Sequence, residues 1–172
     1  MKKCILSLLF VGAISICGLL SFAEGAKADR VGAILGLPTG LSYSHNFTDV
    51  DQLDLTLAVF PGHFLVGYGD HYYGRYAVDF ALGYLRSVVR PNVNGAEAPV
   101  EIGGGLSFTT VSPRSSYVWM TMYFDFRWEI FFASAPTFAL FVDLSPGVGI
   151  FLHSNPYAYF APRCGLGLRA VL

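Results

Sequence analysis

The residues best placed for chemistry in this sequence are charged side chains that recur at alternate positions of apolar segments. In each segment they share their parity with Gly, Ala or Ser, while bulky apolar residues take the other parity. The charged set comprises Asp54, Asp79, Glu101, Asp125, Arg127, Glu129, Asp143, Arg163 and Arg169. Opposite charges enclosed together must pair, because an unpaired buried charge is costly. We therefore predict an ion-pair network with more acid than base, in which Asp143 lies between Arg127 and Arg163.

Nucleophilic catalysis has one candidate pair, His153 and Ser154. Adjacent residues of a strand point to opposite sides, and no acidic residue follows Asp143 that could orient the histidine in a triad. No set of His, Cys and carboxylate residues has metal-ligand spacing, and Cys164 is the only cysteine after residue 28. We predict that the protein is not an enzyme and binds neither a metal nor a cofactor.

The composition is apolar and poor in charge. Of the 172 residues, 53% are hydrophobic, 16% aromatic and 13% charged, with a formal net charge of −1. An average soluble domain carries about 25% charged residues, so this chain has too few to cover a soluble surface. The near-neutral balance also argues against nucleic acid as a partner, because nucleic-acid binding needs a basic face.

The first 28 residues have the organisation of a cleaved export signal. Lys2 and Lys3 are followed by an apolar stretch and then by Ala26-Lys27-Ala28, a small-x-small cleavage pattern. The alternatives are an uncleaved anchor or a lipoprotein attached through Cys17, although Ile16 is large for the residue before a lipoprotein cysteine. We predict Sec export with residues 1–28 removed and residues 29–172 as one mature domain.

The mature chain alternates with period two rather than 3.6. Segments with this alternation cover residues 31–37, 41–47, 53–59, 76–84, 100–108, 120–129, 138–145 and 163–172. Period two is the spacing of β-strands with two unlike faces. No stretch reads as a spanning helix, because the longest uncharged stretches are interrupted by Pro and Gly.

Eight strands with one large-apolar face, in an exported chain, predict an all-β fold, an eight-stranded antiparallel transmembrane β-barrel. The charged and small face would fill the interior of such a narrow barrel. The alternative is a soluble exported barrel of lipocalin type with the apolar face inward, which would leave too little polar surface outside.

Aromatic residues gather near the predicted strand ends. The set is Tyr72, Tyr73, Tyr117, Trp128, Phe131, Tyr157 and Tyr159. Aromatic girdles of this kind lie at the headgroup level of transmembrane barrels. The alternative is the general preference of aromatic residues for strands. We predict a girdle.

Three short motifs, in order, support a family resemblance. They are Gly36-Leu37-Pro38-Thr39-Gly40-Leu41-Ser42, Leu144-Ser145-Pro146-Gly147-Val148-Gly149 and Gly165-Leu166-Gly167-Leu168-Arg169. The chain resembles the small eight-stranded outer-membrane barrels, in particular the OmpW-like proteins described from spirochaetes and more distantly the OmpA and OmpX type. The resemblance implies insertion by the barrel-assembly machinery and, for OmpW relatives, passage of small hydrophobic molecules. Such barrels usually end on an aromatic residue, whereas this chain ends on Leu172.

Our leading hypothesis is a non-enzymatic protein of the cell outer membrane with a structural and surface-exposed role and at most narrow permeability. Its partners would be outer-membrane lipid, the assembly machinery and host surface ligands. The second hypothesis is a conduit for small hydrophobic molecules, and the third a lipid-modifying barrel enzyme. From a periplasmic N-terminus, strand parity places residues 38–40, 61–74, 109–116 and 153–159 outside the cell.

Overall fold

The computed structural model describes residues 27–61, 76–93, 95–112, 118–132, 134–152 and 156–172, and all its regular elements there are strands. They are β1 (Lys27–Leu37), β2 (Thr39–Asn46), β3 (Asp51–Pro61), β4 (Tyr76–Val89), β5 (Asn92–Val93), β6 (Ala96–Glu97), β7 (Val100–Ser112), β8 (Val118–Phe132), β9 (Ala135–Ser145), β10 (Gly147–Leu152), β11 (Tyr157–Phe160) and β12 (Arg163–Val171). Within the described ranges, no helix is long and apolar enough to cross a membrane. The predicted signal segment lies outside these ranges except for residues 27 and 28.

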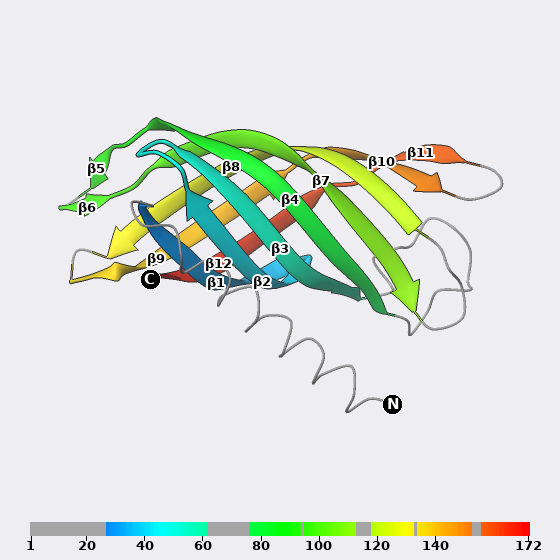
Figure 1. The fold of residues 1–172 in the computed structure, drawn as a ribbon, viewed down its shortest axis with the longest axis horizontal. Coiled ribbons are helices and arrows are strands. Elements are labelled where there is room, and N and C mark those ends of the chain that lie inside the picture. The colour runs from blue at the N-terminus through cyan, green and yellow to red at the C-terminus, as the bar shows by residue number, and fades with distance from the viewer. Residues whose placement is uncertain (1–26, 62–75, 94, 113–117, 133, 153–155) are drawn as a thin grey trace, which may run out of the picture.

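The strands close into a barrel (Figure 1). Neighbouring strands in the wall run antiparallel in the order β1-β2-β3-β4-β7-β8, and β8 then pairs with both β9 and β10. The first and last strands close the wall, since β1 pairs with β12 from Arg30↔Val171 to Leu37↔Cys164. The predicted all-β fold with eight antiparallel wall strands is confirmed.

Two of the eight wall strands are interrupted. Pro146 separates β9 from β10, but its carbonyl accepts the Phe124 amide at 3.0 Å, so both pieces stay paired with β8. A proline has no amide to donate, which explains the break in a continuous strand. Similarly, β11 and β12 flank the Ala161-Pro162 step, where the Ala161 amide donates to the Gly147 carbonyl at 2.9 Å. The twelve short elements therefore form eight wall strands and one small β5–β6 hairpin.

The alternation predicted from the sequence sorts residues between the two faces of the wall. Every wall strand exposes large apolar side chains outward, including Leu35, Leu41, Val59, Phe80, Leu82, Leu106, Phe108, Met122, Phe124, Val142, Leu144, Val148, Leu166 and Leu168. The intervening residues point inward and are mostly small, hydroxyl-bearing or charged. The polar residues are thus the interior of this barrel.

The two ends of the barrel differ in the height of the wall. The start of β1, the C-terminus, the 47–50 turn and the β5–β6 hairpin share one end, which we call the terminal end (left in Figure 1). At the opposite end the wall is lower around the β1–β2 turn at Pro38, because neighbouring strands extend beyond it: among the described residues, Phe60 of β3 pairs only with β4, and β11 pairs only with β10. A turn is present where residues 38–40 predicted one, but it is tighter: only Pro38 lies between β1 and β2, and Thr39 and Gly40 already belong to β2. Thr39 Oγ1 donates to the Gly36 carbonyl at 3.0 Å.

Candidate functional site in the barrel interior

Asp54 on β3 is the centre of the ion pairs inside the barrel. Its Oδ1 accepts hydrogen bonds from Arg127 Nη1 at 2.9 Å, Arg169 Nη2 at 2.6 Å and Ser44 Oγ at 2.6 Å. Its Oδ2 accepts another from Arg127 Nη2 at 3.2 Å. Asp54 is only 5% exposed, and each arginine is 1% exposed. Closure of the barrel thus brings together residues of β3, β8 and β12.

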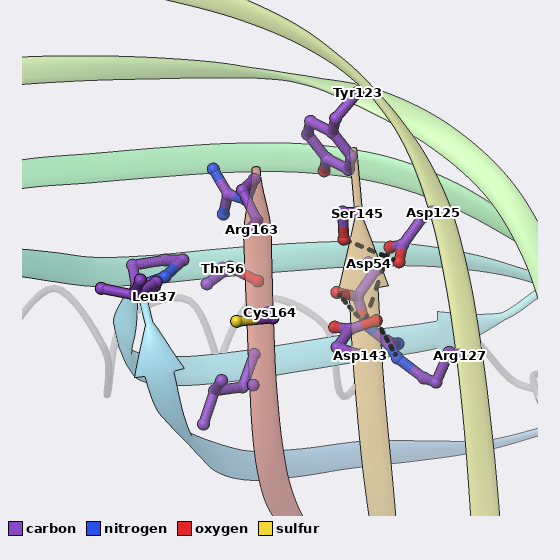
Figure 2. A pocket seen from close by; sticks show the side chains of 13 residues that line it. Leu37, Asp54, Thr56, Tyr123, Asp125, Arg127, Asp143, Ser145, Arg163 and Cys164 are labelled. Atoms are coloured by element: carbon purple, nitrogen blue, oxygen red, sulfur yellow. Dashed lines mark hydrogen bonds and ion pairs between the residues drawn. The ribbon is translucent and has the colours of Figure 1, made fainter. Parts of the chain in front are cut away.

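Asp143 and Asp125 complete this group, which we call the central layer: Asp54, Asp125, Arg127, Asp143 and Arg169. Arg127 donates to both Asp143 oxygens, through Nε at 3.3 Å and Nη2 at 2.8 Å (Figure 2). Asp125 accepts from Ser145 Oγ at 3.0 Å and lies 3.9 Å from Arg127 Nη2. Three carboxylates therefore share two guanidinium groups.

An aromatic ring holds both central guanidinium groups. Phe141 of β9 is 1% exposed, and its ring centre lies 5.0 Å from the Arg127 guanidinium carbon and 4.3 Å from that of Arg169. The ring lies against Gly167 of β12, its cross-strand partner, where a Cβ atom would overlap it. Glycine at this position is therefore needed to make room for the ring that orients the two arginines.

Arg163 does not join the central layer. Its Nη1 donates to Asp79 Oδ2 at 2.8 Å, while Thr109 Oγ1 donates to Asp79 Oδ1 at 2.7 Å. Its guanidinium carbon also lies 5.0 Å from the centre of the Tyr123 ring. The expectation that Asp143 lies between Arg127 and Arg163 is therefore wrong for Arg163. Asp79 on β4 is the nearer acid across the interior, and sequence position alone could not show this.

A second group lies towards the terminal end. We call it the terminal layer: Arg30, Gln52, Glu101 and Glu129. Arg30 Nη1 donates to Glu129 Oε2 and lies 3.9 Å from Glu101 Oε1, and Gln52 Nε2 donates to Glu101 Oε2. Gln52 and Glu101 are each 2% exposed and Glu129 is 0% exposed. Here two carboxylates face one guanidinium.

A smaller polar group lies outside the barrel, at the terminal end. Tyr84 donates a hydrogen bond to Asp51 Oδ1, Thr48 Oγ1 donates to Asp51 Oδ2 at 2.8 Å, and Arg86 Nη1 lies 3.7 Å from Asp51 Oδ1. The hydrogen bonds from Tyr84 and Thr48 lower the pKa of the Asp51 carboxyl below its usual 3.8. We call Thr48, Asp51, Tyr84 and Arg86 the outer cluster.

The predicted aromatic girdle is only partly placed by the structure. Trp128 is 43% exposed on the outward face. Phe131 instead points inward, with the Arg30 guanidinium 5.1 Å from its ring centre. Tyr159 also points inward and packs against Trp119 and Phe151. These two do not belong to an outward girdle, because strand parity puts them on the inner face. Tyr72, Tyr73, Tyr117 and the side chain of Tyr157 lie outside the described part of the chain.

One pocket in the interior reaches the low side of the wall (Figure 2). It runs from Asp54, Asp125 and Arg127 to Leu37, Pro38 and Cys164 around the β1–β2 turn. The candidate catalytic residues His153 and Ser154 lie outside the described residues. Among those described, no group of three His, Cys, Asp or Glu side chains is arranged to hold a metal ion.

The fold and site define the class of this protein as an eight-stranded antiparallel β-barrel with a charged interior. No family model, curated protein or solved structure matches the sequence. The conclusions below therefore rest on the fold and on the interior itself.

Some interior residues had no role in the sequence prediction. Arg30 precedes the first alternating segment, yet it continues the inward parity of Gly32 and Ile34, which was the available signal. Gln52 likewise continues the inward parity of Asp54. The alternation assigned Phe141 to the correct, inward face. Its contact with two arginines, however, depends on which strands become neighbours.

Proposed function

We propose that this chain is an integral β-barrel of the bacterial outer membrane, without catalytic activity, that has a structural and surface-exposed role. One observation carries the proposal: large apolar side chains cover the outward face of every wall strand, whereas charges fill the interior. Water is a poor solvent for such an outer face, and each exposed apolar Å² costs about 25 cal/mol there. Lipid suits it, because a closed barrel satisfies its own backbone groups.

The interior supports at most narrow permeability. The central layer crosses the lumen from β3 to β8 and β12, and its arginine side chains are almost fully buried. An eight-stranded barrel has room for little more than its inward side chains. Since this layer is held by several charge-assisted hydrogen bonds, we expect it to block the axis to solutes larger than water or small ions.

A folding and conductance experiment tests the proposal. The mature chain, refolded in detergent and then in liposomes, should show β-type circular dichroism and a gel migration that changes on boiling. Liposome swelling with sugars should stay near that of empty vesicles. A water-soluble, monomeric protein that folds without detergent would contradict the membrane assignment, and rapid sugar entry would contradict the blocked interior.

Export and assembly complete the proposal. The signal segment and the barrel would direct the chain through Sec and the barrel-assembly machinery into outer-membrane lipid, and the loops would bind host surface ligands. Single cysteines at Asp70 and Glu97, in a Cys164→Ala background, test the orientation with a membrane-impermeant maleimide. Asp70 should react in intact cells and Glu97 only after lysis. The reverse pattern would invert the orientation.

A conduit for small hydrophobic molecules is the second candidate, and the lower part of the wall around the β1–β2 turn favours it. The interior pocket extends to Leu37, Pro38 and the exposed Cys164, beside strand edges of β3 and β11 that lack a further neighbour in the described chain. A bulky maleimide on Cys164 should then slow entry of a hydrophobic dye into cells, while Cys164→Ser cells treated alike should be unaffected. Equal dye entry in both would count against the conduit.

A further inference from the structure

The terminal layer carries a charge imbalance that its own residues do not correct. Arg30 is the guanidinium in direct contact with Glu129, and its Nη1 also lies 3.9 Å from Glu101 Oε1. One positive and two negative groups leave one uncompensated negative charge. All three carboxylate and amide side chains of the layer are at least 98% buried, so bulk water does not screen this charge.

The central layer cannot supply the missing positive charge. Arg127 donates to Asp54 and Asp143, and Arg169 donates to Asp54 and Ser42. Three carboxylates already share these two guanidinium groups. With three carboxylates and two guanidinium groups, the central layer has no surplus positive charge that could neutralise the terminal layer.

Unpartnered oxygen atoms mark where a positive ligand would bind. Glu129 Oε1 and Gln52 Oε1 are buried and have no hydrogen-bond partner among the described residues. The Gln52 amide lies within the layer, because its Nε2 donates to Glu101 Oε2. Glu129 is likewise held there, because its other oxygen accepts from Arg30. Buried acceptors without donors are uncommon in folded proteins, and a bound water or ion is one way to satisfy them.

We propose that the terminal layer binds one monovalent hard cation of the Na⁺ class inside the barrel. Glu129 Oε1 and Gln52 Oε1 are its protein ligands, and the Glu101 carboxylate stabilises it at short range. Oxygen ligands suit hard cations. A single positive charge balances the layer, whereas a divalent ion would leave a buried positive charge. A water molecule would satisfy the two oxygens but would leave the negative charge of the layer uncompensated. The proposal holds whether or not the lumen conducts.

Salt-specific stability tests this site. The protein folded in zwitterionic detergent is unfolded with urea in NaCl or in tetramethylammonium chloride at equal ionic strength and pH, since the larger ion does not fit. We expect a higher midpoint in NaCl that saturates with concentration. At ten times the dissociation constant, Na⁺ raises the ratio of folded to unfolded protein about tenfold.

Matched variants assign the effect to this layer. Glu129→Gln keeps the side-chain shape and balances the charge of the layer. It should therefore abolish the increase in urea midpoint that Na⁺ produces, which we call the Na⁺ increment. Glu97→Gln makes the same change on the exposed β6 and should retain it in full. If Glu129→Gln does not fold, Gln52→Met removes the second ligand and should reduce the increment.

Two results would overturn the proposal. An increment that persists in the Glu129→Gln or Gln52→Met proteins would place any cation elsewhere. Equal midpoints in the two salts, rising together as the pH is lowered, would show that a proton neutralises the layer instead.

Discussion

Two aspartates on the same strand, Asp51 and Asp54, have opposite surroundings. Asp54 points into the barrel and is 5% exposed, with two buried arginines and Ser44 donating to its carboxylate. Asp51 points outward at the terminal end and receives hydrogen bonds from Tyr84 and Thr48. Its side chain is 19% exposed, and that of the nearby Arg86 is 60% exposed. The residue type is the same, and each carboxylate has several donors.

The difference shows that the number of partners does not set the energetic importance of a charge. Loss of one partner in the central layer leaves the others charged in a medium that cannot solvate them. Loss of a partner in the outer cluster leaves groups that water can solvate, where ion pairs contribute little. Burial should therefore separate the two regions in every measurement of stability.

The largest expected effect comes from Asp54→Ala. The change leaves Arg127 and Arg169 without the acid that they share, and Arg169 then has no carboxylate partner among the described contacts. We expect a loss of about 3–5 kcal/mol in the free energy of unfolding, measured by urea titration in detergent. The matched control is Asp51→Ala on the same strand, which should leave the midpoint almost unchanged. Similar midpoints for the two variants would contradict the contrast between the regions.

Asp143→Ala should have a smaller effect than Asp54→Ala. Arg127 loses the hydrogen bonds to Asp143 but keeps those to Asp54. We expect a loss of about 1–3 kcal/mol. A double-mutant cycle with Arg127→Ala should give a coupling energy of about 0.5–3 kcal/mol, since the second change removes the group left unpaired by the first. Strictly additive effects would show that the pair does not interact in solution.

Phe141→Leu tests the ring that contacts both central arginines. The substitution keeps an apolar side chain but removes the aromatic face, which lies 4.3 Å from the Arg169 guanidinium carbon. We expect a loss of about 2 kcal/mol, the order of a desolvated cation–π contact. Phe124→Leu, the same change at a position 53% exposed on the outer face, is the control and should cost much less. Equal losses would assign the effect to general packing.

The smallest expected effect is in the outer cluster. Hydrogen bonds from Tyr84 and Thr48 hold the pKa of Asp51 below its usual 3.8 in the folded protein. A carboxyl with a lowered pKa stabilises the fold above its unfolded-state pKa, and this contribution is lost as the pH falls through the lowered value. Asp51→Asn should therefore slightly flatten the fall in urea midpoint below pH 4. A variant whose pH profile changes most near neutrality would contradict this assignment.

Much of the fold could be predicted from period-two alternation. The alternation of Leu53, Leu55 and Leu57 with Asp54, Thr56 and Ala58 indicated the correct faces, because successive side chains of a strand point to opposite sides. The Pro38 turn was also recognisable. The β5–β6 hairpin was not, since its two-residue strands have no measurable period.

The pairing within the site was less predictable. Membership of the inner face was evident for Asp79 and Arg163, but their contact joins β4 to β12 across the interior. Phe131 and Tyr159 were assigned to a girdle because they lie near strand ends, and their parity places them inside. Position along the strand and choice of face are separate properties, and only the second is read from alternation.

The sequence by itself determined which side chains face inward and that the interior is rich in acid, because these follow from local backbone geometry. Only the tertiary structure decided that Asp54 is the shared acid of Arg127 and Arg169, and that Glu101 and Glu129 share Arg30. Those contacts depend on the stagger of the strands and on closure between β1 and β12, which set the height of each side chain in the lumen. Electrostatic energy varies steeply with distance in a buried site, so a stagger of one residue pair would have selected different partners.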